Sequence, residues 1–478
     1  MGTASLQFVF FGLAVALLSN LSRSLQWRLA ILLIASLVFL ILLAHDPMTL
    51  LPLAAFLVLG YLCMAVVVRG RTKTAVFSVC AIVLTFLWLK KYSFLPHIFF
   101  LKSPYLTLGL SYIFFRLLHV VIEAADPAAR LVVGPREYLA YMLNFTTFIS
   151  GPIQRYDAFA KDQFAPTPIC LDARVVGAQL ERIIRGCFKV NVLALLLNIL
   201  QTDAMAELIN AGPLDTKVFA AFKLVALYPF FLYANFSGYI DIVIALARLM
   251  GIRLPENFDR PFGASSFLDF WNRWHITLST WLKTYVYNPL LVALMRNFTA
   301  TSLQSTFAVV SFFVTFFLVG VWHGRTSEFV LFGVLQGGGV AVNKAWQLFL
   351  ISRLGRKRYR MLANRPLYEA FGRGLTFTWF ALTLFWFWAT WEQIEAAYAA
   401  IGLVWWLAVL ALLWLNSTLI LAAWEWLREK LLSLTIAGAS DLTSLYFRVV
   451  FATALVFVWF VVGLVITEPA PDIVYKAF

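Results

Sequence analysis

Two stretches of the sequence carry side chains that could do chemistry within an otherwise apolar chain. The first, Phe270–Leu290, reads FWNRWHITLSTWLKTYVYNPL and places His275 among amide, hydroxyl and basic side chains. The second, Leu318–Trp346, contains His323 in the pentapeptide GVWHG. Imidazole can take up and return a proton near pH 7, because its unperturbed pKa is about 6.5. These two histidines are therefore the candidates for general acid–base chemistry.

The signatures of several other chemistries are missing from the sequence. No G-x-S-x-G elbow is present, which disfavours a hydrolase-like serine nucleophile. There is no H-E-x-x-H motif, and two candidate histidines are too few for a zinc site. The four cysteines form no C-x-x-C pair, so we expect neither a disulfide nor a metal site. Of the remaining histidines, His45 and His97 are expected near the membrane interface and His119 is expected to be a packing residue.

Read at 100° per residue, the stretch Phe270–Leu290 is predicted to form one polar helix with three faces. In a membrane protein, such a helix usually lines a site or a cavity. Pro289 is expected to stop or break it. One face holds Asn272, His275, Ser279 and Lys283; a second holds Arg273, Thr277, Thr280 and Thr284; the third is aromatic and aliphatic.

Glycines surround His323 in the second stretch. Gly320 and Gly324 form one small-xxx-small pair, and Gly333 and Gly337 form another. Glycines at this spacing allow helices to approach closely. We therefore expect His323 to lie in a tightly packed site near a helix end.

The composition is that of an integral membrane protein. Hydrophobic residues make up 62% of the chain and charged residues only 13%, with a mean hydropathy of +0.83. A soluble chain could not bury so much apolar surface. The net charge of +14 lies mainly in short loops, which favours topology and attraction to anionic lipid over nucleic-acid binding.

Apolar runs suggest roughly ten to thirteen membrane segments, since a span needs about 17–25 residues. Basic groups near residues 23–28, 69–73 and 353–365 are expected in the cytoplasm, which places the N-terminus outside. The runs lie near 5–20, 27–44, 48–68, 75–89, 105–122, 186–202, 217–250, 303–322, 328–350, 374–390, 396–423 and 444–467.

Polar residues also enter the apolar core away from the histidines. The segment FISGPIQRYDAF contains Arg155 and a Gly151-Pro152 step, which predicts a turn or a re-entrant break, with an interfacial loop as the alternative. Asp241 lies within an apolar helix, where a carboxylate is costly and needs a partner. It either binds a catalytic group or pins a neighbouring helix.

Four motifs, in this order and spacing, resemble the membrane-bound O-acyltransferase family. The similarity is closest to the bacterial branch that contains alginate O-acetyltransferases and teichoic-acid D-alanyl transferases. The chain departs from many relatives directly after His323, where Arg325 and its neighbours replace small and aromatic residues. The motifs are SGPIQRY (150–156), FSGYIDIVIALARLMGIRLPENFDRPF (236–262), DFWNRWHITLSTWL (269–282) and GVWHG (320–324).

The resemblance implies an all-α integral membrane protein: a multi-span helical bundle with a central funnel or tunnel. It divides the chain into N-terminal membrane helices (1–100), a catalytic core (101–345), and a basic loop with C-terminal membrane helices (346–478). It implies that His323 is the principal catalytic residue and that His275 supports it. As substrate-binding or supporting residues we expect Asn272, Arg273, Trp271, Asp241, Trp322, Ser279, Arg155 and Gln336.

Acyl transfer to a hydroxyl needs a base for the hydroxyl proton, and the tetrahedral intermediate needs donors to its oxyanion. His275, Asn272 or a backbone N–H could supply such a donor. The expected co-substrate is an acyl thioester, acetyl-CoA or an acyl carrier protein, with acetyl as the expected group and no bound cofactor. The expected acceptor is a hydroxyl of a cell-envelope or exported polysaccharide, reached directly or through an extracytoplasmic transferase or a small membrane partner. The expected location is the bacterial inner membrane.

Three alternatives remain at this stage. The first is D-alanyl transfer from an acyl carrier protein, which the basic run 353–365 could dock, although topology alone also explains that run. The second is a transporter or flippase, supported by the number of spans and the intramembrane Asp241. The third is a silent scaffold that recruits a separate transferase and needs no imidazole.

Overall fold

The computed structural model describes residues 5–44, 46–70, 72–93, 95–96, 98, 100–126, 133–298, 300–435, 441–466 and 469–472. His45 and His97 lie outside the described residues. The described residues form helices joined by loops, without any strand; one isolated antiparallel bridge pairs Phe258 with Trp274. This confirms the predicted all-α class. The predicted central funnel and the sequence divisions at residues 100 and 345 stay predictions.

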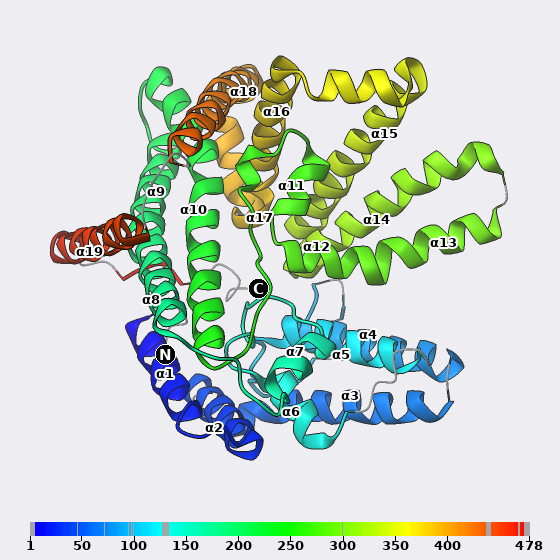
Figure 1. Cartoon of the computed structure of the whole chain (residues 1–478). Coiled ribbons are helices and arrows are strands. Elements are labelled where there is room, and N and C mark those ends of the chain that lie inside the picture. Colours follow the sequence, from blue (N-terminus) through cyan, green and yellow to red (C-terminus); the bar gives the residue numbers. More distant parts are fainter. Residues whose placement is uncertain are drawn as a thin grey trace. The chain divides into compact units, whose positions relative to one another are not determined.

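The chain forms two compact units, of which the first comprises Met1–Phe188, Phe236–Glu256 and Asp472–Phe478. Within it, α3, α4 and α5 pack against one another, and α2 packs against α6 (Figure 1). Its helices are α1 (Leu6–Ser19), α2 (Leu25–Leu43), η1 (Pro47–Leu50), α3 (Leu51–Gly70), α4 (Thr72–Lys90), α5 (Leu110–Ala124), α6 (Pro135–Leu143), α7 (Tyr156–Gln163), α8 (Ala173–Phe188) and the second half of α10 (Leu214–Leu249).

A buried irregular segment, residues 144–154, joins α6 to α7 in this unit. The buried guanidinium of Arg116 donates to the carbonyl oxygens of Tyr141 and Met142, at 2.9 and 2.8 Å, and to that of Thr147. A Cβ at Gly151 would lie 2.5 Å from the Thr147 Cα, so the chain can turn there only with glycine. The predicted break is thus a buried turn, whose carbonyl groups find donors in the protein, rather than an interfacial loop.

The second unit comprises Lys189–Asn235 and Asn257–Pro471. In it, α14 runs beside α15, and α16 packs on α18 (Figure 1). Its elements are the π-helical η3 (Lys189–Ala194), α9 (Leu195–Ile209), the first part of α10, η4 (Pro261–Gly263), α11 (Phe267–Arg273), α12 (Ile276–Leu282), the π-helical η5 (Lys283–Tyr287), α13 (Asn288–Asn297), η6 (Thr301–Leu303), α14 (Gln304–His323), α15 (Ser327–Ala363), α16 (Pro366–Thr383), α17 (Phe385–Trp388), α18 (Trp391–Thr435) and α19 (Asp441–Val465).

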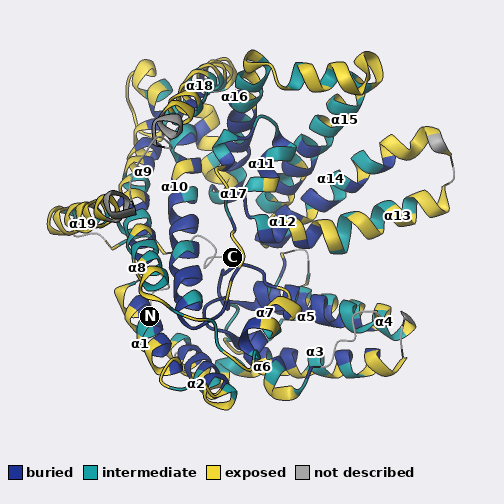
Figure 2. Cartoon of the chain, viewed as in Figure 1, coloured by how far each residue is buried: buried dark blue, intermediate teal, exposed yellow. Residues whose placement is uncertain are grey.

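By length and apolarity, eight of the described helical stretches could cross a membrane, which makes the chain a multi-pass membrane protein. They are fewer than the ten to thirteen segments expected, because α1 and α5 have only 14 and 15 residues and α15 and α16 are not apolar enough. Figure 2 shows exposed residues along α19 and α13 and mainly buried residues in the second half of α10. The eight are Leu25–Leu43, Pro47–Gly70, Lys73–Lys90, Ala173–Ile209, Leu214–Leu249, Gln304–His323, Trp391–Lys430 and Tyr446–Val465.

The prediction of a single helix over Phe270–Leu290 is wrong. Helix α11 ends at Arg273, and α12 begins at Ile276 after His275, which has a left-handed backbone with φ 46° and ψ 52°. A residue other than glycine rarely adopts this backbone conformation, so the surrounding structure must stabilise it. Pro289 also differs from expectation, since it lies in the first turn of α13, where proline is tolerated, and not at a helix stop.

Candidate active site

His323 is the last residue of α14, and its side chain is buried. Just before it, α14 crosses α15 in backbone contact: a Cβ on Gly320 would lie only 2.1 Å from the Gly333 Cα. One turn away on α15, a Cβ on Gly337 would lie 2.6 Å from the carbonyl oxygen of Phe313. The glycines therefore allow the close crossing that the sequence predicted, and His323 lies at the end of it, as expected.

Aromatic rings enclose the His323 imidazole. The ring centroids of Trp322, Phe387 and Phe332 lie 4.6, 5.2 and 6.1 Å from that of His323. Phe387 and Phe332 also contact each other, at 5.2 Å. Because these rings come from α14, α15 and α17, three separate elements form an apolar wall. Such a wall excludes water and strengthens electrostatic interactions inside the site.

His275 meets the Trp322 indole as well, in an edge-on arrangement with ring centroids 6.4 Å apart. Trp322 thus contacts both candidate imidazoles, so the two histidines belong to one cluster within the second unit. His275 is fully buried and lies outside the eight apolar spans. Burial lowers its pKa to about 3, so its ring is neutral near pH 7.

Asn257 fixes the unusual backbone at His275. Its carbonyl oxygen accepts from the N–H of Ile276 at 3.0 Å, and its Oδ1 accepts from the N–H and hydroxyl of Thr277 at 3.1 and 2.8 Å. It therefore satisfies the first donors of α12, as a helix cap does, although it lies well before that helix in the chain. The antiparallel bridge between Phe258 and Trp274 also holds these two backbone segments together.

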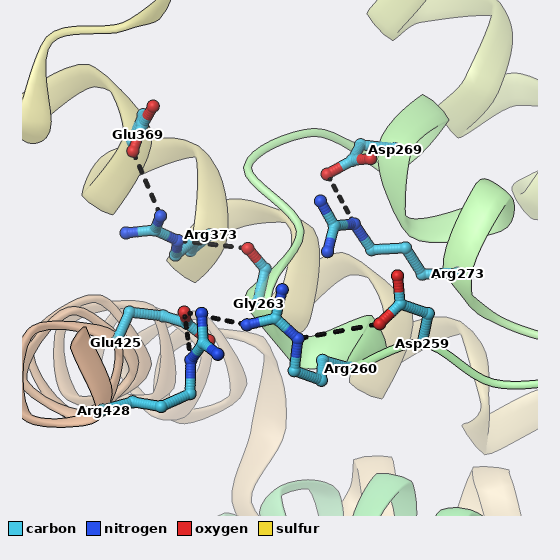
Figure 3. A network of polar contacts seen from close by, with 9 residues as sticks. All are labelled: Asp259, Arg260, Gly263, Asp269, Arg273, Glu369, Arg373, Glu425 and Arg428. Carbon is cyan, nitrogen blue, oxygen red and sulfur yellow. Dashed lines mark hydrogen bonds and ion pairs between the residues drawn. The ribbon is translucent and has the colours of Figure 1, made fainter. Parts of the chain in front are cut away.

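Ion pairs fix the loop that carries Asn257 and the helix that precedes His275 (Figure 3). Arg260 lies 3.5 Å from Glu425 of α18, and Arg373 of α16 donates to the carbonyl oxygen of Gly263 at 3.2 Å. The candidate Arg273 pairs with Asp269 of its own helix at 3.0 Å. The remaining pairs in Figure 3 are Arg260–Asp259, Arg373–Glu369 and Arg428–Glu425.

Two further candidates are buried in the same unit. Trp271 packs on Phe316 of α14, with ring centroids 4.9 Å apart. Gln336 of α15 donates through Nε2 to the Thr383 hydroxyl of α16 at 2.7 Å. Both residues therefore connect elements that surround the histidines.

The other candidates of this unit lie nearer the surface. Asn272 is exposed, and Ser279 is half-buried, with its hydroxyl donating to the Trp274 carbonyl at 3.4 Å. The single-helix prediction placed both on one face with His275, but Asn272 lies on α11 and Ser279 on α12, on either side of the break.

Asp241 and Arg155 belong to the first unit. Asp241 accepts from Arg182 of α8 at 2.9 Å, and Arg182 also donates to Glu256 at 2.7 Å. Of the two alternatives for Asp241, this arrangement supports the one in which it pins a neighbouring helix. Arg155 pairs with Glu123 at 2.8 Å.

His119 of α5 is a packing residue, as expected. Its ring is buried, and its Nε2 accepts from the backbone N–H of Tyr156 at 3.0 Å. An imidazole nitrogen that accepts a hydrogen bond carries no proton, so the ring is neutral. Because Tyr156 is the first residue of α7, this hydrogen bond also caps the start of that helix.

Sequence reasoning missed Asn257, Phe332 and Phe387. Asn257 was visible only as part of a loop signal, Pro255-Glu256-Asn257, and no local pattern indicates that it caps a helix so far along the chain. Phe332 and Phe387 are two among 45 phenylalanines. Their role comes from the positions of α15 and α17, which the sequence does not specify locally.

The described residues contain no group of three or more His, Cys, Asp or Glu side chains that could hold a metal ion. None of the four cysteines, all of which the structure describes, forms a disulfide bond. The site contains two buried imidazoles that both contact the Trp322 indole, in apolar surroundings. This arrangement suits proton transfer to and from a bound substrate.

The model of the MBOAT, membrane-bound O-acyltransferase family, matches residues 75–385. The chain is 33% identical over 242 residues to the "Teichoic acid D-alanyltransferase" of Streptococcus thermophilus, covering 50% of this chain and 57% of the relative. It is 32% identical over 256 residues to the "Probable alginate O-acetylase AlgI" of Pseudomonas syringae pv. tomato, covering 52% and 44%. The aligned segment thus spans about half the length of these curated relatives.

Proposed function

The chain belongs to the membrane-bound O-acyltransferase family, and from this premise we propose that it moves an acyl group from a thioester donor to a hydroxyl acceptor. We take acetyl as the group and acetyl-CoA or an acyl carrier protein, on the cytoplasmic side, as the donor. The acceptor is a hydroxyl of a cell-envelope or exported polysaccharide, reached directly or through a partner protein. The inner membrane of a bacterium is the proposed location.

The observation that carries this proposal is the placement of His323. Its imidazole lies at the C-terminus of the 20-residue helix α14, in contact with the aromatic side chains of Trp322, Phe387 and Phe332. The C-terminal end of a helix carries a partial negative charge, which stabilises the positive charge that develops when imidazole takes up a proton. Aromatic faces add to this stabilisation. His323 is therefore suited to act as general base.

The proposed reaction has two steps. The acceptor oxygen attacks the thioester carbonyl carbon while His323 takes the hydroxyl proton, which gives a tetrahedral oxyanion and an imidazolium. The oxyanion then collapses, the carbon–sulfur bond breaks, and the imidazolium returns the proton to the leaving thiolate. Atoms and charges balance without a metal or a redox partner. Enclosure by aromatic rings protects the thioester from water.

His275 is the proposed supporting residue. Because burial keeps its ring neutral, it can donate a hydrogen bond to the oxyanion without competing for the proton that His323 takes. Its contact with the Trp322 indole also positions the wall of the site. Trp271, Gln336, Arg273, Ser279 and Asn272 are proposed to hold or line the site, and Asp241 and Arg155 to support the first unit.

D-alanyl transfer from an acyl carrier protein is the second candidate function. One of the reported relatives carries a D-alanyltransferase name, and another carries an O-acetylase name. Both reactions pass an acyl group from sulfur to oxygen, so the same imidazole serves either. A transporter or flippase is disfavoured by the family match, and it would not need the imidazole of His323.

The test uses the purified full chain with labelled acetyl-CoA, acetyl carrier protein or D-alanyl carrier protein, and an acceptor glycan. His323→Ala is expected to abolish product acylation while membrane insertion and thermal unfolding stay close to those of the parent. His119→Gln is the matched control: it replaces another buried histidine, outside the proposed site, and is expected to keep activity in the folded fraction. Full acylation by correctly inserted His323→Ala would refute the proposal, and the donor that gives product distinguishes acetyl from D-alanyl transfer.

A further inference from the structure

Helix α15 changes direction at Gly355, whose φ of 76° and ψ of 156° lie outside the helical region. The short helical segment that follows, 356–363, carries a cavity of about 370 Å³. The cavity is an open hollow on the protein surface, because all of its lining residues are exposed. The residues that line it are Arg356, Lys357, Arg360, Met361 and Asn364.

No acidic residue lies near the three cations of this cavity in the sequence. Between Glu328 and Glu369 the sequence contains no acidic residue, and Glu369 itself pairs with Arg373. Within the described part of the chain, Arg356, Lys357 and Arg360 form no ion pair, and all three are exposed. Arg356 and Arg360 are four residues apart on one helical face, which is an unfavourable spacing for like charges.

Exposed apolar side chains lie beside these cations. Met361, which lines the cavity, is 56% exposed, and Leu367, just beyond it, is 86% exposed. Basic groups next to exposed apolar groups are typical of a segment at the membrane surface, where cations meet phosphate groups and apolar side chains meet acyl chains. A dense basic run alone could serve topology, but topology does not require three of its cations to line one cavity.

We propose that this cavity is a binding site for a phosphate group, held by the guanidinium groups of Arg356 and Arg360 and the ammonium group of Lys357. Guanidinium groups bind phosphate through two parallel hydrogen bonds, and an ammonium group adds a point charge. The phosphate belongs either to an anionic phospholipid headgroup or to a soluble phosphate ester, and the exposed apolar neighbours favour the lipid. The site is separate from the histidine cluster, and the proposal does not depend on acyl transfer.

The experiment compares two triple variants of the full chain that remove the same charge. The first, Arg356→Gln with Lys357→Gln and Arg360→Gln, changes the cavity. The second, Arg353→Gln with Arg358→Gln and Arg365→Gln, changes the other three cations of the same run and serves as the matched control. The substituted residues are exposed, so we expect both variants to fold, and thermal unfolding checks this. The single variant Arg360→Gln replaces the first triple if that protein does not fold.

Binding is measured in detergent by native mass spectrometry with phosphatidylglycerol and phosphatidylcholine, and by calorimetry with coenzyme A and inorganic phosphate. The parent is expected to bind phosphatidylglycerol in preference to phosphatidylcholine, more weakly as salt increases. The cavity triple is expected to lose this binding at least tenfold, and the control triple less than threefold. Cavity-dependent binding of coenzyme A or phosphate instead would support the site and assign it to a soluble ester. Equal losses in the two triples, or no loss in the cavity triple for any probe, would overturn the proposal.

Discussion

Replacing Gly333 by alanine should force α14 and α15 apart directly before His323. A Cβ at this position would lie 2.5 Å from the carbonyl oxygen of Phe317 and 3.3 Å from the Gly320 Cα. Cβ atoms essentially never approach other atoms closer than 3.0 Å, and the nearest atom here belongs to a backbone that cannot rotate away. The two helices must therefore separate by about half an ångström at the crossing.

Gly338→Ala, on the same helix, separates the energetic cost of this clash from the general effect of alanine in a helix. At Gly338 a Cβ meets nothing within 4 Å, so Gly338→Ala should only gain the helix propensity of alanine, about 1 kcal/mol. Gly333→Ala gains the same amount but adds overpacking, which typically costs about 1–3 kcal/mol. The difference between the two variants in free energy of unfolding is thus expected to be about 1–3 kcal/mol, with Gly338→Ala the more stable.

Activity should fall further than stability in Gly333→Ala, because His323 is at the end of the displaced helix. A misplacement of about 1 Å can cost about a hundredfold in rate, so half of it predicts roughly a tenfold loss in kcat. Thermal unfolding in detergent and transfer of a labelled acyl group measure the two effects on the same preparations. A Gly333→Ala protein as stable and as active as Gly338→Ala would refute the view that this crossing positions His323.

Three further predictions concern the residues that hold the site. Asn257→Ala should lower the free energy of unfolding by about 1–3 kcal/mol, because it leaves the N–H and hydroxyl of Thr277 without their acceptor. Asn257→Asp keeps that acceptor and should lower it less, and denaturation of both variants checks this. Thr383→Val should lower the free energy of unfolding by about 1–3 kcal/mol, because it leaves the buried Gln336 amide without its acceptor. Gln336→Leu should lower it less, since the Thr383 hydroxyl keeps its hydrogen bond to the Phe380 carbonyl at 2.9 Å. Denaturation of the two variants ranks them. His275 takes up a proton below about pH 6.5 in the unfolded state, but only near its lowered pKa of about 3 in the folded state. The contribution of neutral His275 to the free energy of unfolding is therefore complete above about pH 6.5 and is lost as the pH falls toward 3. His275→Gln should show a flatter dependence of the unfolding midpoint on pH over that interval.

The sequence predicted those features that depend on local composition and spacing. The apolar runs predicted a multi-pass helical protein, because a membrane span is a property of about twenty consecutive residues. The spacing of Gly333 and Gly337 predicted a close helix crossing, because glycines four residues apart lie on one helical face. The second predicted pair is not helical, since α14 ends at His323 and Gly324 has an extended backbone. In both cases neighbouring residues alone determine the feature.

The break at His275 could not be predicted in this way. The residues around it have the periodicity of a helix, but hydrogen bonds to Asn257 and the bridge to Phe258, both in an earlier loop, hold the left-handed backbone. That loop is in turn held by Arg373 and Glu425, which lie more than a hundred residues later in the chain. Local periodicity is overridden here by hydrogen bonds and ion pairs that exist only after the helices of this unit have assembled.

The two imidazoles lie at opposite kinds of helix end, and this difference favours a division of roles between them. His323 ends α14, and the C-terminal end of a helix carries a partial negative charge. His275 precedes α12, where the first N–H groups create a positive end, and its burial acts in the same direction by disfavouring a charged ring. The proposal that His323 is the base and His275 a neutral hydrogen-bond donor rests on the different helix ends at which they lie and on the neutral ring of His275.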